Sequence, residues 1–348
     1  MSDDSAPGWE AIDAALRQLY GDAEPQHFGT LIKWSIGGPD PLDGVSAYKR
    51  DDHWHFVSYG LSELYEKESD DEAVSGYGFE LTFRLARQSV DEAPPVWAMN
   101  FMQNLARYVF DSGNVFEAGH YLDANGPIAS DEPTELTAVC FAQDPELSPI
   151  DTPHGSVAFL QIVGVTADEH DAMRRWNSDK FQAIMKVDSP LLLTELSRNC
   201  IMGDAGVQQQ VSEGIERDGS SMAWLNVSEL SWKKRGLIRK SSVAIQIGAR
   251  AAGEIAAAMT SRVLRGNPFS LIGGEGALSI SPAERCRWHE DEDGVLNLEV
   301  SPDLANTLAA ELLPRAGKYT WPALPGVTID VVPTEILDRD GKVVKTIG

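Results

Sequence analysis

The stretch "DDHWHFVSYGLSELY", residues 51–65, places two histidines one residue apart. Because side chains alternate along an extended chain, His53 and His55 would share one face. Two imidazoles on one face are enough to begin a zinc or iron site, with a third ligand supplied from elsewhere. The alternative is a half-exposed strand that happens to carry histidine, with Phe56 pointing inward from the opposite face. The spacing allows both interpretations, and we favour the strand.

Other motifs that would indicate an enzyme fail at a required position. In "GARAAGEI" the glycines have the spacing of a phosphate-binding loop, but Glu254 and Ile255 stand where Lys and Ser or Thr are required. The sequence contains no G-x-S-x-G, H-E-x-x-H or C-x-x-C pattern. We therefore predict a non-enzymatic protein with no cofactor and no metal. A metal-dependent enzyme built on the two histidines is the less favoured alternative.

Length and composition describe a globular protein. The chain has 348 residues, 43% of them hydrophobic and 24% charged. No apolar run approaches the roughly 20 residues that a membrane helix needs, and the acidic start "MSDDSAPGWE" does not resemble a signal peptide. The three cysteines lie far apart, which favours free thiols. We expect a cytoplasmic protein.

The net charge of −24 bears on possible partners. Nucleic-acid binding needs cations that displace the phosphate counterions, so a field of this sign disfavours it. The same field favours basic partners and speeds encounter with them. High solubility alone is the alternative explanation of the charge.

Apolar periodicity predicts both helices and strands along the chain. Helices are expected at 8–21, 94–113, 166–176, 252–265 and 302–313. Strands are expected at 51–60, 76–87, 136–144, 156–165 and 327–332, and loops at 37–48 and 63–72. In the clearest strand Phe79, Leu81, Phe83 and Leu85 alternate with polar residues, so one face is expected on a core.

The elements are interspersed without strict β-α-β alternation, which predicts the α+β class. The stretch "KKRGLIRKSS" carries five basic residues and no acid in an otherwise acidic chain. We interpret residues 233–242 as a basic linker between an amino-terminal domain at 1–232 and a carboxyl-terminal domain at 243–348.

Several stretches, taken together and in this order, resemble the Suppressor of fused family. They cover most of residues 30–220: "GGPDPLDGVSAY", "HWHFVSYGLSELY", "SGYGFELTFRLAR", "LARYVF", "TPHGSVAFLQIVGVTADE", "WN" and "VSEGIERDGS". Near the carboxyl terminus, "KYTWPALPGVTIDVVP" resembles the last strand pair of the family.

The resemblance implies two α+β domains, each a mixed β-sheet with packed helices, separated by a cleft. In animals the family restrains Gli transcription factors, and a short Gli segment adds as a β-strand in that cleft. The long insert of animal members at the domain boundary is missing here, which implies a bacterial-type member. Bacterial relatives are thought to be immunity proteins that neutralise toxins, and the acidic charge suits that role. A peptide-binding regulator without a toxin partner is the alternative.

The resemblance also implies partner-binding residues. A peptide-contacting tyrosine of the family matches Tyr108, and Phe110 lies in the same motif. A family aspartate that pairs with the Gli peptide aligns with His120, beside Tyr121. That departure removes the charge that receives the Gli histidine, so strand addition would here use a different partner sequence.

The remaining motif residues are given a structural role by the resemblance. His53 and His55 are expected to hold the following loop by hydrogen bonds. The "GGPDPLD" segment is expected to be a shaped turn, in which prolines fix φ and glycines permit unusual angles. The turn residues are Gly37, Gly38, Pro39 and Pro41.

Overall fold

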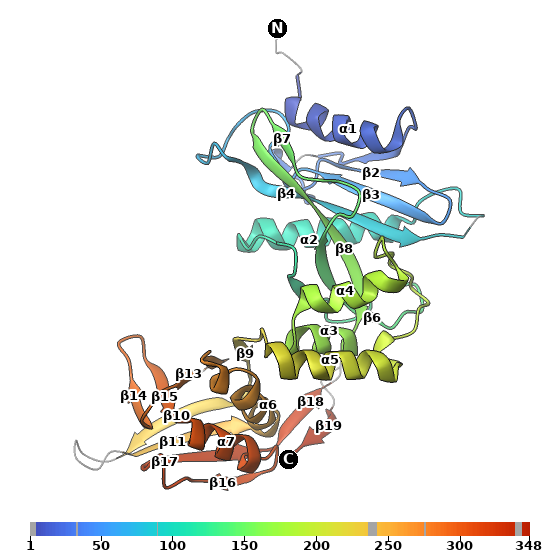
Figure 1. Cartoon of the computed structure of the whole chain (residues 1–348). Coiled ribbons are helices and arrows are strands. Elements are labelled where there is room, and N and C mark those ends of the chain that lie inside the picture. The colour runs from blue at the N-terminus through green and yellow to red at the C-terminus, as the bar shows by residue number, and fades with distance from the viewer. Residues whose placement is uncertain (1–4, 33, 89, 236–241, 275, 338–342) are drawn as a thin grey trace. The chain divides into compact units, whose positions relative to one another are not determined.

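The computed structural model shows two compact units, each with helices packed on mixed β-sheets (Figure 1). The first comprises Met1–Met173 and Asn177–Gln208, and the second comprises Arg174–Trp176 and Gln209–Gly348. The predicted α+β class and the presence of two folded parts are confirmed. The structure describes residues 5–32, 34–88, 90–235, 242–274, 276–337 and 343–348.

Among the described residues, the strands of the first unit form one eight-stranded sheet in the order β1-β2-β3-β4-β8-β6-β5, with β7 also paired to β8. Strands β4 and β8 are parallel, and the other pairs are antiparallel. The strands are β1 Gln26–Gly29, β2 Gly44–Lys49, β3 His53–Tyr59, β4 Val74–Ala86, β5 Tyr121–Asp123, β6 Leu136–Gln143, β7 Ile150–Thr152 and β8 Gly155–Thr166.

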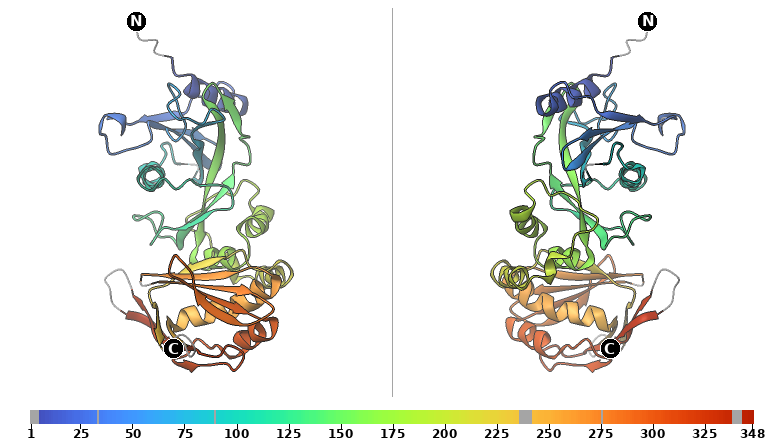
Figure 2. Two further views of the ribbon diagram at one scale, coloured as in Figure 1. Left: turned by 90° about the vertical axis from the view of Figure 1, so that its left-hand side faces the viewer. Right: turned by 90° about the vertical axis from the view of Figure 1, so that its right-hand side faces the viewer.

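Helices α1 (Pro7–Tyr20) and α2 (Val96–Ser112) cover opposite faces of this sheet (Figures 1 and 2). On one face Ile12 and Leu16 of α1 pack with Val57, and on the other α2 packs with Phe56. The remaining helical segments that begin in this unit are η1 Trp34–Ile36, α3 Ala167–Arg175, α4 Ser178–Asp188, η2 Ile201–Gly203 and α5 Ala205–Asp218.

The ends of these helices follow signals in the sequence. Gly113 takes the left-handed conformation, with φ 71°, and its N–H closes α2 on the Val109 carbonyl. At the start of α3, Thr166 N–H donates to the Glu169 carboxylate at 2.9 Å, and Glu169 N–H donates back to the Thr166 hydroxyl. This reciprocal pair is the capping box that the sequence predicts.

One predicted loop is partly wrong. The Gly- and Pro-rich stretch 37–48 was expected to be irregular throughout, but its last residues form β2. Gly44 pairs with Tyr59, and the antiparallel register continues to Lys49 opposite Trp54. The pairing with β3 supplies partners for the backbone N–H and C=O groups, and this outweighs the local turn composition.

The prediction of a half-exposed β3 is also wrong, because both faces of this strand are buried. In β4 the polar residues that alternate with Phe79–Leu85 are buried as well, and Glu80, Thr82 and Arg84 are each 0% exposed. Helix α1 covers the sheet face that the alternation would leave to water. The polar side chains there must satisfy one another.

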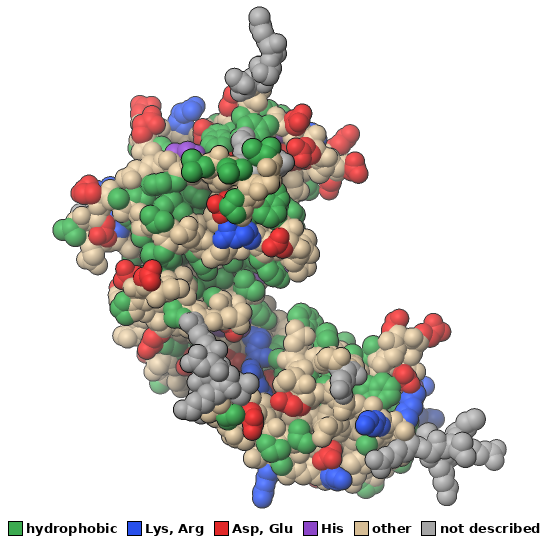
Figure 3. All heavy atoms as spheres, turned by 180° about the vertical axis from the view of Figure 1, so that it is seen from behind, with side chains coloured by type: hydrophobic (Ala, Val, Ile, Leu, Met, Phe, Trp, Pro, Cys, Tyr) green, Lys and Arg blue, Asp and Glu red, His purple; other side chains and the backbone are tan. Residues whose placement is uncertain are grey.

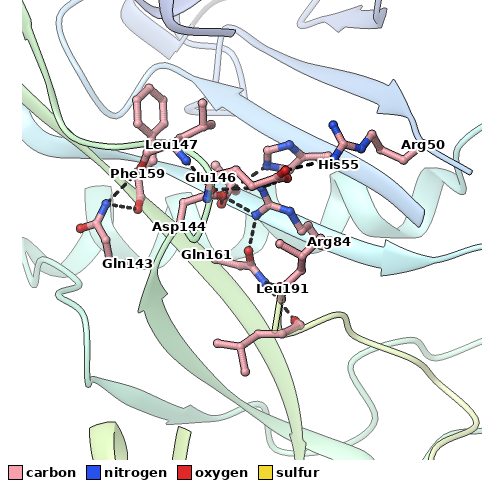
Figure 4. A network of polar contacts seen from close by, with 12 residues as sticks. Arg50, His55, Arg84, Gln143, Asp144, Glu146, Leu147, Phe159, Gln161 and Leu191 are labelled. Carbon is pink, nitrogen blue, oxygen red and sulfur yellow. Dashed lines mark hydrogen bonds and ion pairs between the residues drawn. The ribbon is translucent and has the colours of Figure 1, made fainter. Parts of the chain in front are cut away.

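Thr82 and Arg84 do so in a network centred on the Arg84–Asp144 pair (Figure 4). The Arg84 guanidinium donates to both Asp144 oxygens, at 2.6 and 3.0 Å, and reaches Glu146 at 3.0 Å. It also donates to Gln161, whose amide in turn donates to the carbonyls of residues 191 and 192. Asp144 further accepts the N–H groups of Glu146 and Leu147 at 2.8 Å. The network joins β4, β8 and the segment that follows β6.

Among the described residues, the second unit contains a four-stranded sheet of order β10-β11-β17-β16, a five-stranded sheet of order β14-β15-β13-β12-β9 and the hairpin β18-β19. Helices α6 (Ala249–Ser261) and α7 (Pro302–Glu311) share one apolar core with both larger sheets. The short helix η3 is Val263–Arg265. The strands are β9 Trp224–Asn226, β10 Leu230–Arg235, β11 Ser242–Gly248, β12 Phe269–Gly273, β13 Gly276–Pro282, β14 Arg287–Glu290, β15 Val295–Val300, β16 Gly317–Tyr319, β17 Val327–Val332, β18 Thr334–Leu337 and β19 Val343–Ile347.

The basic stretch at 233–242 was expected to link two domains, but its described ends belong to two paired strands inside the second unit. Its first residues end β10 and its last begins β11, and these strands pair antiparallel from Leu230 opposite Ile247 to Arg235 opposite Ser242. Residues 236–241 lie outside the described residues. Since both strands belong to the second unit, the two units divide earlier in the chain, at Gln208–Gln209.

Two further features agree with the composition. The cysteines Cys140, Cys200 and Cys286 are free thiols. No described helix combines the length and the apolar character needed to cross a bilayer.

The buried ion pair generates a prediction about stability. Replacing Arg84 by Met leaves the Asp144 carboxylate buried without its main partner, so Arg84→Met should lower the free energy of unfolding by about 3–5 kcal/mol. Urea unfolding at pH 7 measures the change. Arg17→Met, at an exposed position of α1, is the matched control and should cost less than about 0.5 kcal/mol. Equal effects of the two substitutions would contradict the central role of Arg84.

Candidate functional site

The histidine pair lies on one face of β3, as its spacing predicts, and both side chains are buried. His53 Nδ1 is hydrogen-bonded to the Asp52 carboxylate at 2.7 Å. His55 Nδ1 is hydrogen-bonded to the Tyr20 hydroxyl of α1 at 2.6 Å. His55 Nε2 lies 3.3 Å from Asp144 Oδ2 but is not aligned for a hydrogen bond. His53 is therefore held by Asp52, and His55 is held by Tyr20 of α1 and lies beside Asp144 of the buried network.

The environment of His55 favours the neutral imidazole. Complete burial lowers the pKa of His55 to about 4, and the neighbouring Asp144 carboxylate opposes this shift only in part. Burial also works to raise the pKa of Asp144, but the nearby His55 imidazole and the hydrogen bonds from Arg84 hold it below its usual value. In the parts of the chain that the structure describes, no three His, Cys, Asp or Glu side chains are placed to hold a metal ion.

The loop after β3 is held by Glu80, a residue that the sequence analysis did not single out. Its carboxylate accepts the Gly60 N–H at 2.9 Å, the Ser62 N–H at 3.0 Å and both the Ser58 and Ser62 hydroxyls. Burial nevertheless raises the pKa of the Glu80 carboxyl. The position of Glu80 between Phe79 and Leu81 in a strand could have indicated a buried carboxylate. The alternation of apolar and polar residues instead assigned Glu80 to the solvent-facing side of the strand.

The turn at 37–41 is joined to α2. Gly37 has φ 90°, a left-handed conformation that glycine adopts easily. The Arg107 guanidinium donates to the Asp40 carboxylate at 2.6 Å, and the Leu42 N–H donates to the Gln103 amide oxygen at 3.1 Å. The turn is thus fixed on the same helix that carries the predicted partner-binding residues Tyr108 and Phe110.

Those two residues face different surroundings, because positions two apart on an α-helix differ by about 200°. The Tyr108 ring, 39% exposed, stacks on Phe116, which stacks on Phe141 of β6. The Phe110 ring contacts Tyr77 and Trp34 edge-on.

His120 and Tyr121 lie at the start of β5, and only His120 is on the Phe141 face of the sheet, which Tyr108 also approaches. The Phe141 N–H donates to the His120 carbonyl at 2.9 Å, and Tyr121 pairs with Cys140 of β6. The Tyr121 ring contacts His170 of α3 edge-on. The structure therefore links Tyr108 to the His120 side of β5 through Phe116 and Phe141, with Tyr121 on the opposite face of the same strand, and it places Phe110 elsewhere.

Strand β5 is the terminal strand of the first unit's sheet in the part of the chain that the structure describes. A terminal strand presents backbone groups to which another extended segment can pair. Aromatic side chains next to such an edge can receive the side chains of the added segment. The β5 edge thus offers backbone groups and nearby aromatic side chains to an extended segment.

Comparisons with known proteins confirm the resemblance seen in the sequence. A family model described as Suppressor of fused protein (SUFU) matches residues 38–199. The Suppressor of fused homologs of Homo sapiens and Mus musculus are each 36% identical over 245 residues, which is 65% of this chain and 50% of each relative. The chain thus spans about half the length of the curated relatives it matches.

Two solved structures are also similar. The crystal structure of Drosophila Suppressor of Fused has a TM-score of 0.82 and 22% identity, over 95% of this chain and 98% of that chain, and it supports the fold. A chain from the Sufu-Fu complex crystal structure has a TM-score of 0.57 and 31% identity, over 61% of this chain and 98% of its own length.

The buried histidine generates a prediction about pH. An unfolded imidazole titrates near pH 6.5, whereas the pKa of His55 in the fold is about 4. Between these values the unfolded chain binds a proton that the folded chain does not, so stability is complete above pH 6.5 and falls as the pH drops toward 4. The shift is equivalent to about 3 kcal/mol.

Unfolding in urea at pH 7.0 and 4.5 tests this contribution. The loss of unfolding free energy between the two pH values should be smaller in His55→Asn than in the wild type, since the substitution removes the titrating group. Other carboxylates and His53 titrate in both proteins and cancel in the difference. An identical pH dependence in the variant would show that His55 does not carry the effect.

Proposed function

The chain belongs to the Suppressor of fused family, and we propose that it is a non-enzymatic protein that binds and sequesters a protein partner. A similar solved structure is that of a Sufu-Fu complex, so a relative has been crystallised in a complex. In our proposal an extended segment of the partner adds to the sheet at β5. Main-chain hydrogen bonds then give affinity, and pockets for alternate side chains give selectivity.

The position of β5 at the end of the sheet is the observation that carries the proposal. The His120 carbonyl and the Ala124 N–H are both bonded to β6. In an antiparallel pair such residues alternate with residues whose backbone groups point the other way. By this alternation the backbone N–H of Asp123 points to the open edge, where an added strand would accept it.

The aromatic residues beside β5 supply the side-chain contacts in this proposal. Tyr108 is partly exposed and is held against Phe116 by ring stacking, so little conformational entropy is lost when a partner covers it. His120 is half exposed and lies 4.0 Å from Glu117. Together with Tyr121, these residues are the partner-binding set that we propose for the β5 edge.

We further propose that the partner is basic and that the protein acts in the cytoplasm as an immunity factor of bacterial type. The support is the net charge of −24, which favours and accelerates association with a positively charged toxin domain. A peptide-binding regulator without a toxin is the second candidate. A neighbouring gene that encodes a large secreted protein with a toxin domain would favour the first candidate, and its absence would favour the second.

Pull-down from native cells with mass spectrometry identifies the partner, and substitutions at the edge then test the binding mode. Asp123→Pro removes the outward N–H at a position where a sheet edge tolerates proline, so affinity should fall at least tenfold. Tyr108→Ala should weaken binding by about tenfold, because it removes an aromatic contact.

Asp123→Asn is the matched control, since it keeps the backbone N–H and a side-chain acceptor for the Asn125 N–H. It should bind within about twofold of the wild type. Normal partner binding by both Asp123→Pro and Tyr108→Ala would place the interaction on another surface.

The charge gives a separate kinetic prediction. Association with a basic partner should slow by at least tenfold between about 20 and 500 mM salt, because salt screens the attraction between the two fields. Stopped-flow measurement of the association rate tests this, with dissociation followed in parallel. An association rate that ignores salt would argue against a basic partner.

A further inference from the structure

A second surface of the first unit surrounds Phe110. The Phe110 ring meets Trp34 at 5.5 Å and Tyr77 at 5.0 Å, measured between ring centroids, with interplanar angles of 68° and 61°. These three rings line a cavity of about 520 Å³, which we call the aromatic pocket. Glu66 and Glu68 lie on its wall. A cavity of this size accommodates one or two side chains of a partner.

The wall of the aromatic pocket is fixed in advance. The Tyr77 N–H donates to the Leu61 carbonyl at 2.9 Å, next to the loop that Glu80 holds. Gly76 has φ 56°, and a Cβ there would come within 2.7 Å of the same carbonyl oxygen. Because this wall is already ordered before a ligand arrives, binding loses little conformational entropy in ordering it.

The acidic side of the pocket is fixed as well. The Glu63 carboxylate accepts the N–H groups of Glu68 and Ser69 and the Lys67 ammonium, so Lys67 is already paired. Burial works to raise the pKa of Glu63, but these hydrogen bonds lower it to about 2. Glu66 and Glu68 are exposed, and the described residues offer neither an ion-pair partner. The pocket therefore combines aromatic rings with two exposed carboxylates that have no ion-pair partner among the described residues.

Three exposed aliphatic residues lie within three positions of Trp34 in the sequence. The surface of the first unit shows gathered hydrophobic side chains (Figure 3). Among the most exposed are Leu31 at 102%, Ile36 at 75% and Ile32 at 51%. We call these three residues the apolar rim. A concentration of exposed aliphatic side chains next to a preformed pocket is typical of an interaction surface.

We propose that the aromatic pocket binds a Lys or Arg side chain of a protein partner, while apolar residues that flank this side chain pack on the apolar rim. Cations are attracted to the faces of Trp, Tyr and Phe rings and to carboxylates, and the pocket offers both. A second copy of this chain is disfavoured as the occupant, because acidic surfaces of equal sign repel each other. This inference rests on the proposed protein-binding function, but not on β5.

A random dodecapeptide library displayed on phage, selected on the immobilised full-length chain, provides the probe. Selected sequences should share a Lys or Arg beside an aliphatic or aromatic residue. One such peptide, synthesised with a fluorescent label, is then titrated by anisotropy. Replacing its basic residue by norleucine should weaken binding at least tenfold, since norleucine keeps the aliphatic stem and loses the charge.

Variants of the chain localise the binding. Trp34→Ala should weaken the peptide at least tenfold. The double variant Glu66→Gln/Glu68→Gln keeps shape and removes two charges, so it should weaken the peptide about fivefold and reduce its salt dependence. The matched control Glu216→Gln/Glu292→Gln removes two exposed charges from the second unit and should bind within twofold of the wild type.

Several outcomes would overturn the inference. They are selected peptides without a basic residue, binding that both pocket variants leave unchanged, and no peptide that distinguishes wild type from Trp34→Ala. Dimerisation that Trp34→Ala abolishes would assign the surface to a second copy of the chain. The Asp123→Pro variant should bind the pocket peptide normally. A peptide lost in Asp123→Pro but retained in Trp34→Ala would support the β5 proposal and contradict this one.

Discussion

The buried pair of Arg84 and Asp144 is the interaction on which the first unit depends. A sheet covered by helices on both faces normally carries apolar residues on both, yet this one encloses a charged pair. The bidentate contact and the side-chain partner Gln161 compensate the desolvation of both ions. The donors and acceptors come from β4, β8 and the segment after β6, so the network fixes these segments against one another. His55 of β3 lies beside it in the neutral form, 3.3 Å from Asp144.

Helix α2 contributes residues to two different surfaces of the first unit. One side of its last turns presents Tyr108 toward Phe116 and the β5 edge, and the other presents Phe110 toward Trp34 and Tyr77. The helix ends at Gly113 and is tied to the 37–41 turn by Arg107. A rigid helix that carries contact residues on two sides can hold two segments of a partner at once. Avidity would then follow if one partner reached both surfaces.

The two surfaces differ in what they can recognise. An edge strand binds mainly through backbone groups and is tolerant of sequence. The aromatic pocket has Glu66 and Glu68 on its wall, and in our proposal it would select a positive charge. In this combination the edge would supply affinity and the pocket would supply selectivity.

The sequence by itself determined the α+β class and the family, and it predicted several local elements, such as α1, α2, β4 and β8. Those features depend on caps, periodicity and runs of residues that are neighbours in the chain, such as the Thr166–Glu169 capping box. It could not determine that the polar face of β4 is buried, because Glu80, Thr82 and Arg84 alternate as exposed residues would. Their burial depends on α1 and on Asp144, which is 60 residues from Arg84. The separation of Phe110 from Tyr108, and its meeting with Trp34, were likewise decided by packing between distant segments, which no local pattern encodes.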